Sequence, residues 1–109
     1  MSVERQEADL TLWADGVAAE LEHKERPELA AIFRALARRD GEAIRLALDV
    51  LAGPMLEAVA EMIDEERRDR ARAGQERVAR ILAWAIALVR EAEDLRGPDL
   101  GPAPSATVQ

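Results

Sequence analysis

The run ILAWAIALV, from Ile81 to Val89, is a stretch of nine consecutive apolar residues in a chain whose residues are 34% charged. It has three possible explanations: a membrane anchor, a core helix, or a helix with a face that only another chain covers. A membrane-spanning helix needs about 20 apolar residues, and Arg80 and Arg90 border this run directly. Its length excludes a span, so the core and interface explanations remain.

Composition points to one acidic domain. The chain has 109 residues, enough for a single core, and residues 1–96 are expected to form it. Its net charge of −7 argues against a generic binder of nucleic acid or anionic membrane. Cysteine is absent, which excludes disulfides and cysteine-ligated zinc. The N-terminus MSVERQEADL is acidic where a signal peptide would be basic, so we predict a cytoplasmic protein.

Apolar residues recur at helical spacing along the whole chain, and no segment alternates as a strand would. We therefore predict an all-α bundle of about five helices, with breaks near Pro27, Gly41, Gly53-Pro54 and Gly74. In the first two helices, about 3–24 and from residue 27 onwards, the expected core stripes are Leu10, Trp13, Val17 and Leu21, then Leu29, Ile32, Phe33 and Leu36.

The third helix, expected at about 41–52, is the most apolar by pattern. Ile44, Ala47, Leu48 and Leu51 take one side, and Leu46 and Val50 widen it. An apolar surface this wide predicts a central helix with neighbours on several sides. The residues expected in the core are Leu36, Leu48, Leu51, Val59 and Ile63.

The polar stretch from Asp64 to Arg77 predicts a solvated helix in which acids precede arginines by four residues. Gly74 is expected to end this helix; the alternative is one long projecting helix that contains Gly74. The tail, residues 97–109, is rich in Pro, Gly and Ala and is predicted to be disordered.

The last helix, about 75–95, is apolar nearly all round. Ile81, Ala85 and Leu88 share a stripe that should face the bundle, while Trp84 and Ile86 lie to either side of it. Because the third helix is expected at the centre, we assign the remaining apolar surface to a second copy of the chain. The predicted homodimer interface comprises Ile81, Trp84, Ile86 and Leu88.

Few residues are candidates for metal binding or catalysis. Glu20 and His23 have the Glu-x-x-His spacing of di-iron helical proteins, yet one such pair also arises easily by chance, and a surface histidine at a helix end is favoured. Glu57 and Glu61 share a solvated face. The only serines, Ser2 and Ser105, lie in the termini, so nucleophilic catalysis lacks a candidate. We predict no enzymatic activity, no cofactor and no bound metal.

DNA binding is the main alternative to protein binding. Ala37 and Gly41 have helix-turn-helix spacing, but the helix that follows offers only Arg45 between two acids. A phosphate-binding patch could instead form from the arginines between the fourth and fifth helices, although acids interleave them. Its members would be Arg67, Arg68, Arg70, Arg72, Arg77 and Arg80.

The sequence therefore favours a non-enzymatic protein-interaction module, acting as an adaptor, inhibitor or regulatory subunit, that forms homo-oligomers and binds an unidentified protein. Nucleic acid and membrane are not expected partners. The first alternative is a DNA-associated transcriptional regulator that uses the Arg67 to Arg80 segment. The second is a metal-binding helical protein built on Glu20 and His23. The patterns fit many helical bundles and identify no family.

Overall fold

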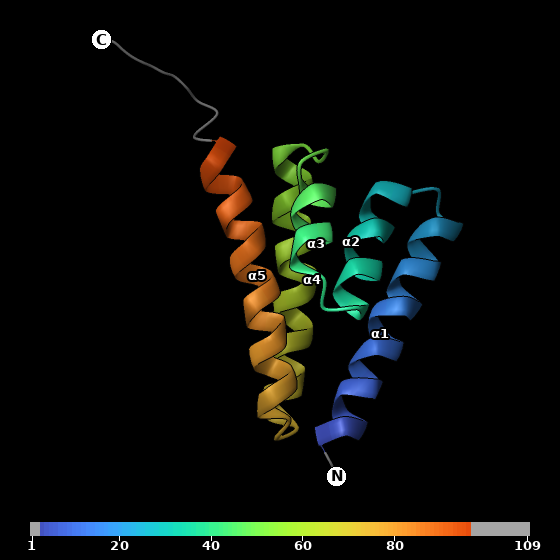
Figure 1. Ribbon diagram of the computed structural model, residues 1–109, viewed down its shortest axis with the longest axis vertical. Helices are drawn as coiled ribbons and strands as arrows, with labels where there is room; N and C mark the ends of the chain where they lie inside the picture. The colour runs from blue at the N-terminus through green and yellow to red at the C-terminus, as the bar shows by residue number, and fades with distance from the viewer. Residues whose placement is uncertain (1–2, 97–109) are drawn as a thin grey trace.

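The computed structural model describes residues 3–96, which form five helices and no strand (Figure 1). The helices are α1 (Val3–His23), α2 (Pro27–Ala37), α3 (Gly41–Leu48), α4 (Gly53–Arg72) and α5 (Glu76–Arg96). The all-α bundle and its four breaks are confirmed, including the turn at Gly74. The tail predicted to be disordered lies outside the described residues.

The helices form two hairpins connected by α3. In Figure 1, α1 lies beside α2 and α4 lies beside α5, because short turns bring consecutive helices back antiparallel. The short helix α3 packs against α2 on one side and α5 on the other. It therefore links the two hairpins, and its position decides which side of α5 is covered.

Three of the helices end in the same hydrogen-bonded turn, the Schellman motif. At the end of α2, the N–H of Asp40 donates to the carbonyl of Ala35 at 3.0 Å and the N–H of Arg39 donates to that of Leu36 at 3.0 Å. The motif needs one residue with positive φ, and Gly74 supplies it after α4. After α1 and α2 the residues are Glu25 (φ 62°) and Arg39 (φ 56°), where a side chain makes this conformation costly.

The centre of the core is α2: α3 does lie between two neighbours, α2 and α5, but the prediction that it is the most buried helix is wrong. Seven of the 11 residues of α2 are buried, including Phe33, whose ring meets Trp13 edge-on at 5.8 Å. In α3 only Ile44 and Leu48 are buried, while Leu46 and Val50 are 63% and 71% exposed. The reason is that α3 packs against α2 and α5 but its outward side faces solvent, so its wide apolar surface is only half covered. The five residues predicted for the core, Leu36, Leu48, Leu51, Val59 and Ile63, are all buried.

The first helix packs through smaller side chains than its pattern suggests. Leu10, Ala14 and Ala18 are fully buried, whereas Trp13 and Val17, like Leu21, are only partly buried. Alanines four residues apart lie on one face of a helix and allow close approach of its neighbour. Of the predicted stripe, Leu10 therefore lies within the contact of α1 with the core, and the other three residues border it.

Arg39 joins the end of α2 to α1. Its guanidinium donates to the carbonyls of Leu36 (3.2 Å) and Ala37 (2.7 Å) in α2, and to the carbonyl of Glu7 (2.9 Å) and the hydroxyl of Thr11 (3.2 Å) in α1. Burial lowers the pKa of the Arg39 guanidinium below its ordinary value, because desolvation penalises the charged form, and the carboxylate of Glu7 opposes this. One side chain thus adds hydrogen bonds to the carbonyls at the end of α2 and connects them to α1.

Replacement of Leu48 by alanine tests the contribution of α3 to the core. Leu48 is fully buried, so Leu48→Ala should lower the free energy of unfolding by about 2–5 kcal/mol through lost burial and a cavity. Leu46→Ala, in the same helix but exposed, is the matched control and should change it by about 0.5 kcal/mol or less. Urea unfolding followed by circular dichroism measures both. Equal effects would show that α3 does not contribute to the core.

Arg39→Lys tests the link between α1 and α2. Lysine keeps the charge but not the planar fork that reaches four acceptors, so the variant should lose about 1–3 kcal/mol of unfolding free energy. Arg38→Lys, at the neighbouring exposed position, is the control and should leave stability unchanged. If Arg39→Lys matched wild type in urea unfolding, these hydrogen bonds would contribute no net stability.

Glu25→Gly tests the cost of the turn after α1. Glycine adopts positive φ without strain, which should outweigh its greater freedom in the unfolded chain and raise stability by about 0.5–1 kcal/mol. Glu25→Ala retains a side chain at this φ and should gain nothing. Thermal and urea unfolding should rank the glycine variant above both the alanine variant and wild type; a glycine variant less stable than wild type would contradict this.

Candidate functional site: the outer face of the last helix

One side of α5 packs in the core and the other is open. Val78, Leu82, Ala85 and Val89 are buried against the bundle, and Figure 1 shows α5 at the edge of the molecule, next to α3 and α4. Trp84 lies at the border between the two sides and is 37% exposed. The open side of α5 is therefore the place where large side chains meet solvent.

A hollow of about 460 Å³, here named the basic hollow, lies beside Trp84. Three arginines, one acid and two apolar side chains line it: Arg39, Arg77, Arg80, Glu7, Ile81 and Trp84. Arg77 is paired with Glu7, whereas Arg80 makes no ion pair within residues 3–96. The hollow thus combines an aromatic ring with an excess of positive charge.

The position of Trp84 depends on a glycine at the start of α3. A Cβ atom at Gly41 would lie 3.2 Å from Cζ2 of Trp84, closer than side chains normally approach. The absence of a side chain at Gly41 lets the indole lie against the first turn of α3. Trp84 is therefore held partly by its own chain while the rest of its ring stays accessible.

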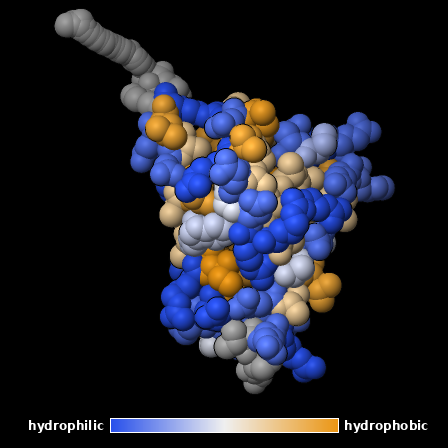
Figure 2. All heavy atoms as spheres, viewed as in Figure 1, coloured by the Kyte–Doolittle hydropathy of each residue, from blue (hydrophilic) through white to orange (hydrophobic). Residues whose placement is uncertain are grey.

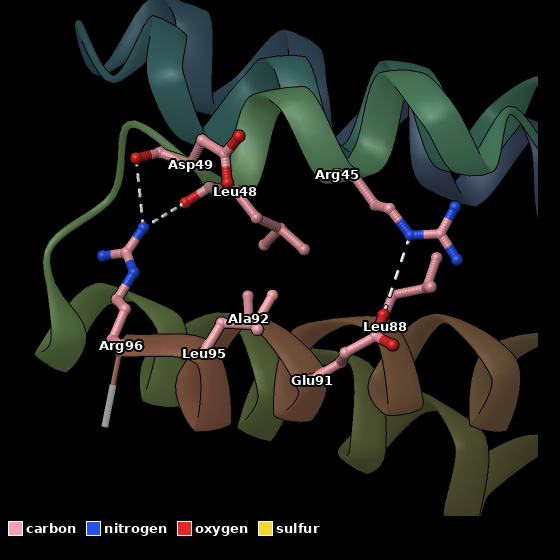
Figure 3. Close-up of a pocket in the computed structure, with 8 residues that line it drawn as sticks. All are labelled: Arg45, Leu48, Asp49, Leu88, Glu91, Ala92, Leu95 and Arg96. Carbon is pink, nitrogen blue, oxygen red and sulfur yellow. Dashed lines mark hydrogen bonds and ion pairs between the residues drawn. The ribbon is translucent and has the colours of Figure 1, made fainter. Parts of the chain in front are cut away.

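A second hollow of about 460 Å³ lies further along α5 and is named here the α3–α5 cleft (Figure 3). Its lining comprises Arg45, Leu48, Asp49, Leu88, Glu91, Ala92, Leu95 and Arg96. Arg96 closes one end by donating to the carbonyls of Leu48 (2.8 Å) and Asp49 (3.1 Å), which caps α3. At the other end Arg45 Nε lies 3.6 Å from Glu91 Oε1.

Apolar side chains are exposed around the α3–α5 cleft. Leu46, Val50 and Leu95 are each more than 60% exposed, and Figure 2 shows separate hydrophobic areas on this face, bordered by hydrophilic side chains. Four of the five large apolar side chains that are exposed within residues 3–96 therefore lie on α3, on α5 or in the turn after α3: Leu46, Val50, Trp84 and Leu95.

The four residues predicted for the interface do not all lie together in the structure. Ile81 and Trp84 lie together in the basic hollow. Leu88 lines the α3–α5 cleft but is only 6% exposed, so it belongs mainly to the chain's own core. Ile86 is partly buried against the core and lines neither hollow. The homodimer itself stays a prediction.

The six arginines of the alternative phosphate patch do not form one free positive surface. Five of them have a carboxylate partner: Arg67 and Arg68 with Asp64, Arg70 with Glu66, Arg72 with Asp69, and Arg77 with Glu7. The Arg70–Glu66 pair, at 2.6 Å, is largely covered, and Arg70 also donates to Gln75 at 2.9 Å. Four of these arginines therefore pair within α4 and its turn, and Arg77 pairs with α1, so these five do not present free positive charge.

No cluster of side chains suited to a metal ion forms among residues 3–96. His23 is exposed, Glu20 lies 3.8 Å from Lys24, and no group of three or more His, Asp or Glu side chains is placed to hold a metal ion in this part of the chain. The hydrogen bond from Arg90, at 2.9 Å, lowers the pKa of Glu57 below its ordinary value. A general acid needs a shift in the opposite direction.

Two parts of this face could not be read from the sequence. In the sequence, Arg39 and Arg96 look like ordinary surface arginines. In the structure, both side chains bend back and donate to carbonyls at the ends of helices. The basic hollow combines side chains from α1, the turn before α3, and α5, and residues so far apart in the chain give no local signal.

None of the helices described here is long and apolar enough to cross a membrane. Comparison with protein-family models, curated proteins and solved structures found no match for the chain.

Proposed function

We propose that this protein is a non-enzymatic interaction module that forms a homo-oligomer through α5 and binds another protein as an adaptor, inhibitor or regulatory subunit. One observation supports this most strongly: Trp84 is fixed against Gly41, remains 37% exposed, and is flanked by Arg77 and Arg80. Tryptophan and arginine are the residue types that most often dominate binding energy at protein interfaces. A pre-positioned ring also loses little conformational freedom on binding.

We assign two roles to the exposed face formed by α3 and α5. The exposed leucines and valine of this face, Leu46, Val50 and Leu95, add apolar surface beyond the ring of Trp84. A second copy covers α5, and the partner protein binds the remaining surface on α3. The absence of cysteine fits a reducing compartment such as the cytoplasm.

The DNA-binding alternative has less support because its arginines are mostly neutralised by neighbouring acids. Phosphate binding would have to displace these carboxylates, in a chain of net charge −7. The metal-binding alternative would need Glu20 and His23 from more than one copy. Absorbance at 260 against 280 nm and metal analysis of the purified protein test these alternatives.

Light scattering coupled to size exclusion tests the proposal. Wild type should show a mass above 12.0 kDa that rises with concentration, and Trp84→Glu should weaken association by about 2 kcal/mol or more, roughly thirtyfold in Kd. Leu12→Glu is the control, because Leu12 is an exposed leucine of α1 outside both hollows. A wild type that stays monomeric at high concentration would refute self-association.

A further inference from the structure

The open side of α5 carries six residues at alternating spacings of three and four. Arg77, Arg80, Trp84, Ala87, Glu91 and Asp94 follow this order, and all six are exposed. Such spacing places them along one line on a helix, as in the contact line of a coiled coil. We name this line the α5 seam.

Charge is strictly ordered along the α5 seam. The two residues nearest the N-terminus of α5 are arginines, the middle two are Trp84 and Ala87, and the last two are acids. A parallel pair of such helices would place arginine beside arginine and acid beside acid. An antiparallel pair would place each arginine beside an acid, with the apolar residues in the middle.

We propose that two copies of the chain associate through antiparallel α5 seams, with a twofold axis that passes α5 between Ala85 and Ile86. This rests on the self-association proposed above and specifies its geometry. The axis places Arg80 opposite Glu91 of the second copy and Arg77 opposite Asp94. It also places Trp84 over Ala87, a small side chain that leaves room for the indole. A twofold axis makes every such contact occur twice.

Both hollows fit this arrangement. Arg77 and Arg80 line the basic hollow and Glu91 lines the α3–α5 cleft. The acidic end of one α5 would therefore lie over the basic hollow of the other copy. Each hollow is completed by side chains that its own chain does not supply.

The ion pairs within one chain do not prevent the charged residues of the α5 seam from pairing with a second copy. Arg80 and Asp94 make no ion pair within residues 3–96. The Arg45–Glu91 pair has side chains that are 58% and 57% exposed, and Arg77 is likewise more than half exposed in its pair with Glu7. Solvent-exposed pairs of this kind are weak, so Glu91 and Arg77 can take new partners at little cost.

Charge reversal tests the pairing. Arg80→Glu and Glu91→Arg should each weaken the dimer by about tenfold or more in Kd, because each turns two attractive contacts into repulsive ones. The double variant Arg80→Glu/Glu91→Arg should return to within about threefold of wild type, since it restores opposite charges. Sedimentation velocity measures the three constants. Arg26→Glu, exposed at the start of α2, controls for net charge, and Arg45→Gln controls for loss of the Arg45–Glu91 pair.

A distance measurement tests the orientation independently. The chain has no cysteine, so Glu76→Cys gives a single attachment point for a nitroxide label at the start of α5. Labels in the two copies should lie about 30 Å apart in the antiparallel pair, from a rise of about 1.5 Å per residue, and about 10 Å apart in a parallel pair. Pulsed electron paramagnetic resonance distinguishes these distances.

The outcomes separate this inference from the proposed function. Rescue by the double variant together with the long distance supports the antiparallel seam. A dimer that depends on Trp84 but shows no rescue, or the short distance, overturns the seam and leaves self-association standing. A wild type that is monomeric throughout overturns both.

Discussion

The carbonyl groups at the ends of α2 and α3 need hydrogen-bond donors, and the side chains that supply them hold neighbouring helices together. The last carbonyls of any helix lack partners within it, and α2 and α3 end close to neighbouring helices, where other helices limit access for water. Arg39 donates hydrogen bonds to carbonyls at the end of α2, and Arg96 donates to carbonyls at the end of α3. Because Arg39 also donates to Glu7 and Thr11 of α1, while Arg96 belongs to α5, each guanidinium connects two helices as well as capping one. Arg39 therefore holds α2 against α1 within the first hairpin, and Arg96 holds the linking helix α3 against α5 of the second.

The placement of α3 has a direct consequence for the surface. Because α3 is short and packs only through the side that faces α2 and α5, Leu46 and Val50 stay in solvent. Its first turn at Gly41 covers only part of Trp84. A longer, more central α3 would have hidden the face that α5 now exposes. The apolar circumference of the run Ile81 to Val89 is therefore covered on its core side and left open on the other.

The helices and most of the core could be predicted from the sequence, because prolines and glycines mark the breaks between helices and the spacing of apolar residues marks their buried faces. The sequence was not sufficient for α3, since spacing shows how wide an apolar surface is but not how many helices cover it. The predicted core also lacked Ala14 and Ala18. Both are fully buried, but their small side chains give only a weak apolar signal in the sequence. The basic hollow depends on the turn at Arg39 and on the approach of Glu7 to Arg77, contacts between segments that only the folded chain brings together.

Net charge and local charge act in opposite directions on self-association. Two chains of net charge −7 repel each other at long range, so a dimer needs an interface that is not itself acidic. The α5 seam meets this condition because its two arginines balance its two acids around an apolar centre. The same order of charges makes one orientation favourable and the opposite one repulsive, which is how charged positions beside a helical contact select partner and direction. The apolar residues would then supply most of the affinity, and the charges would determine the register.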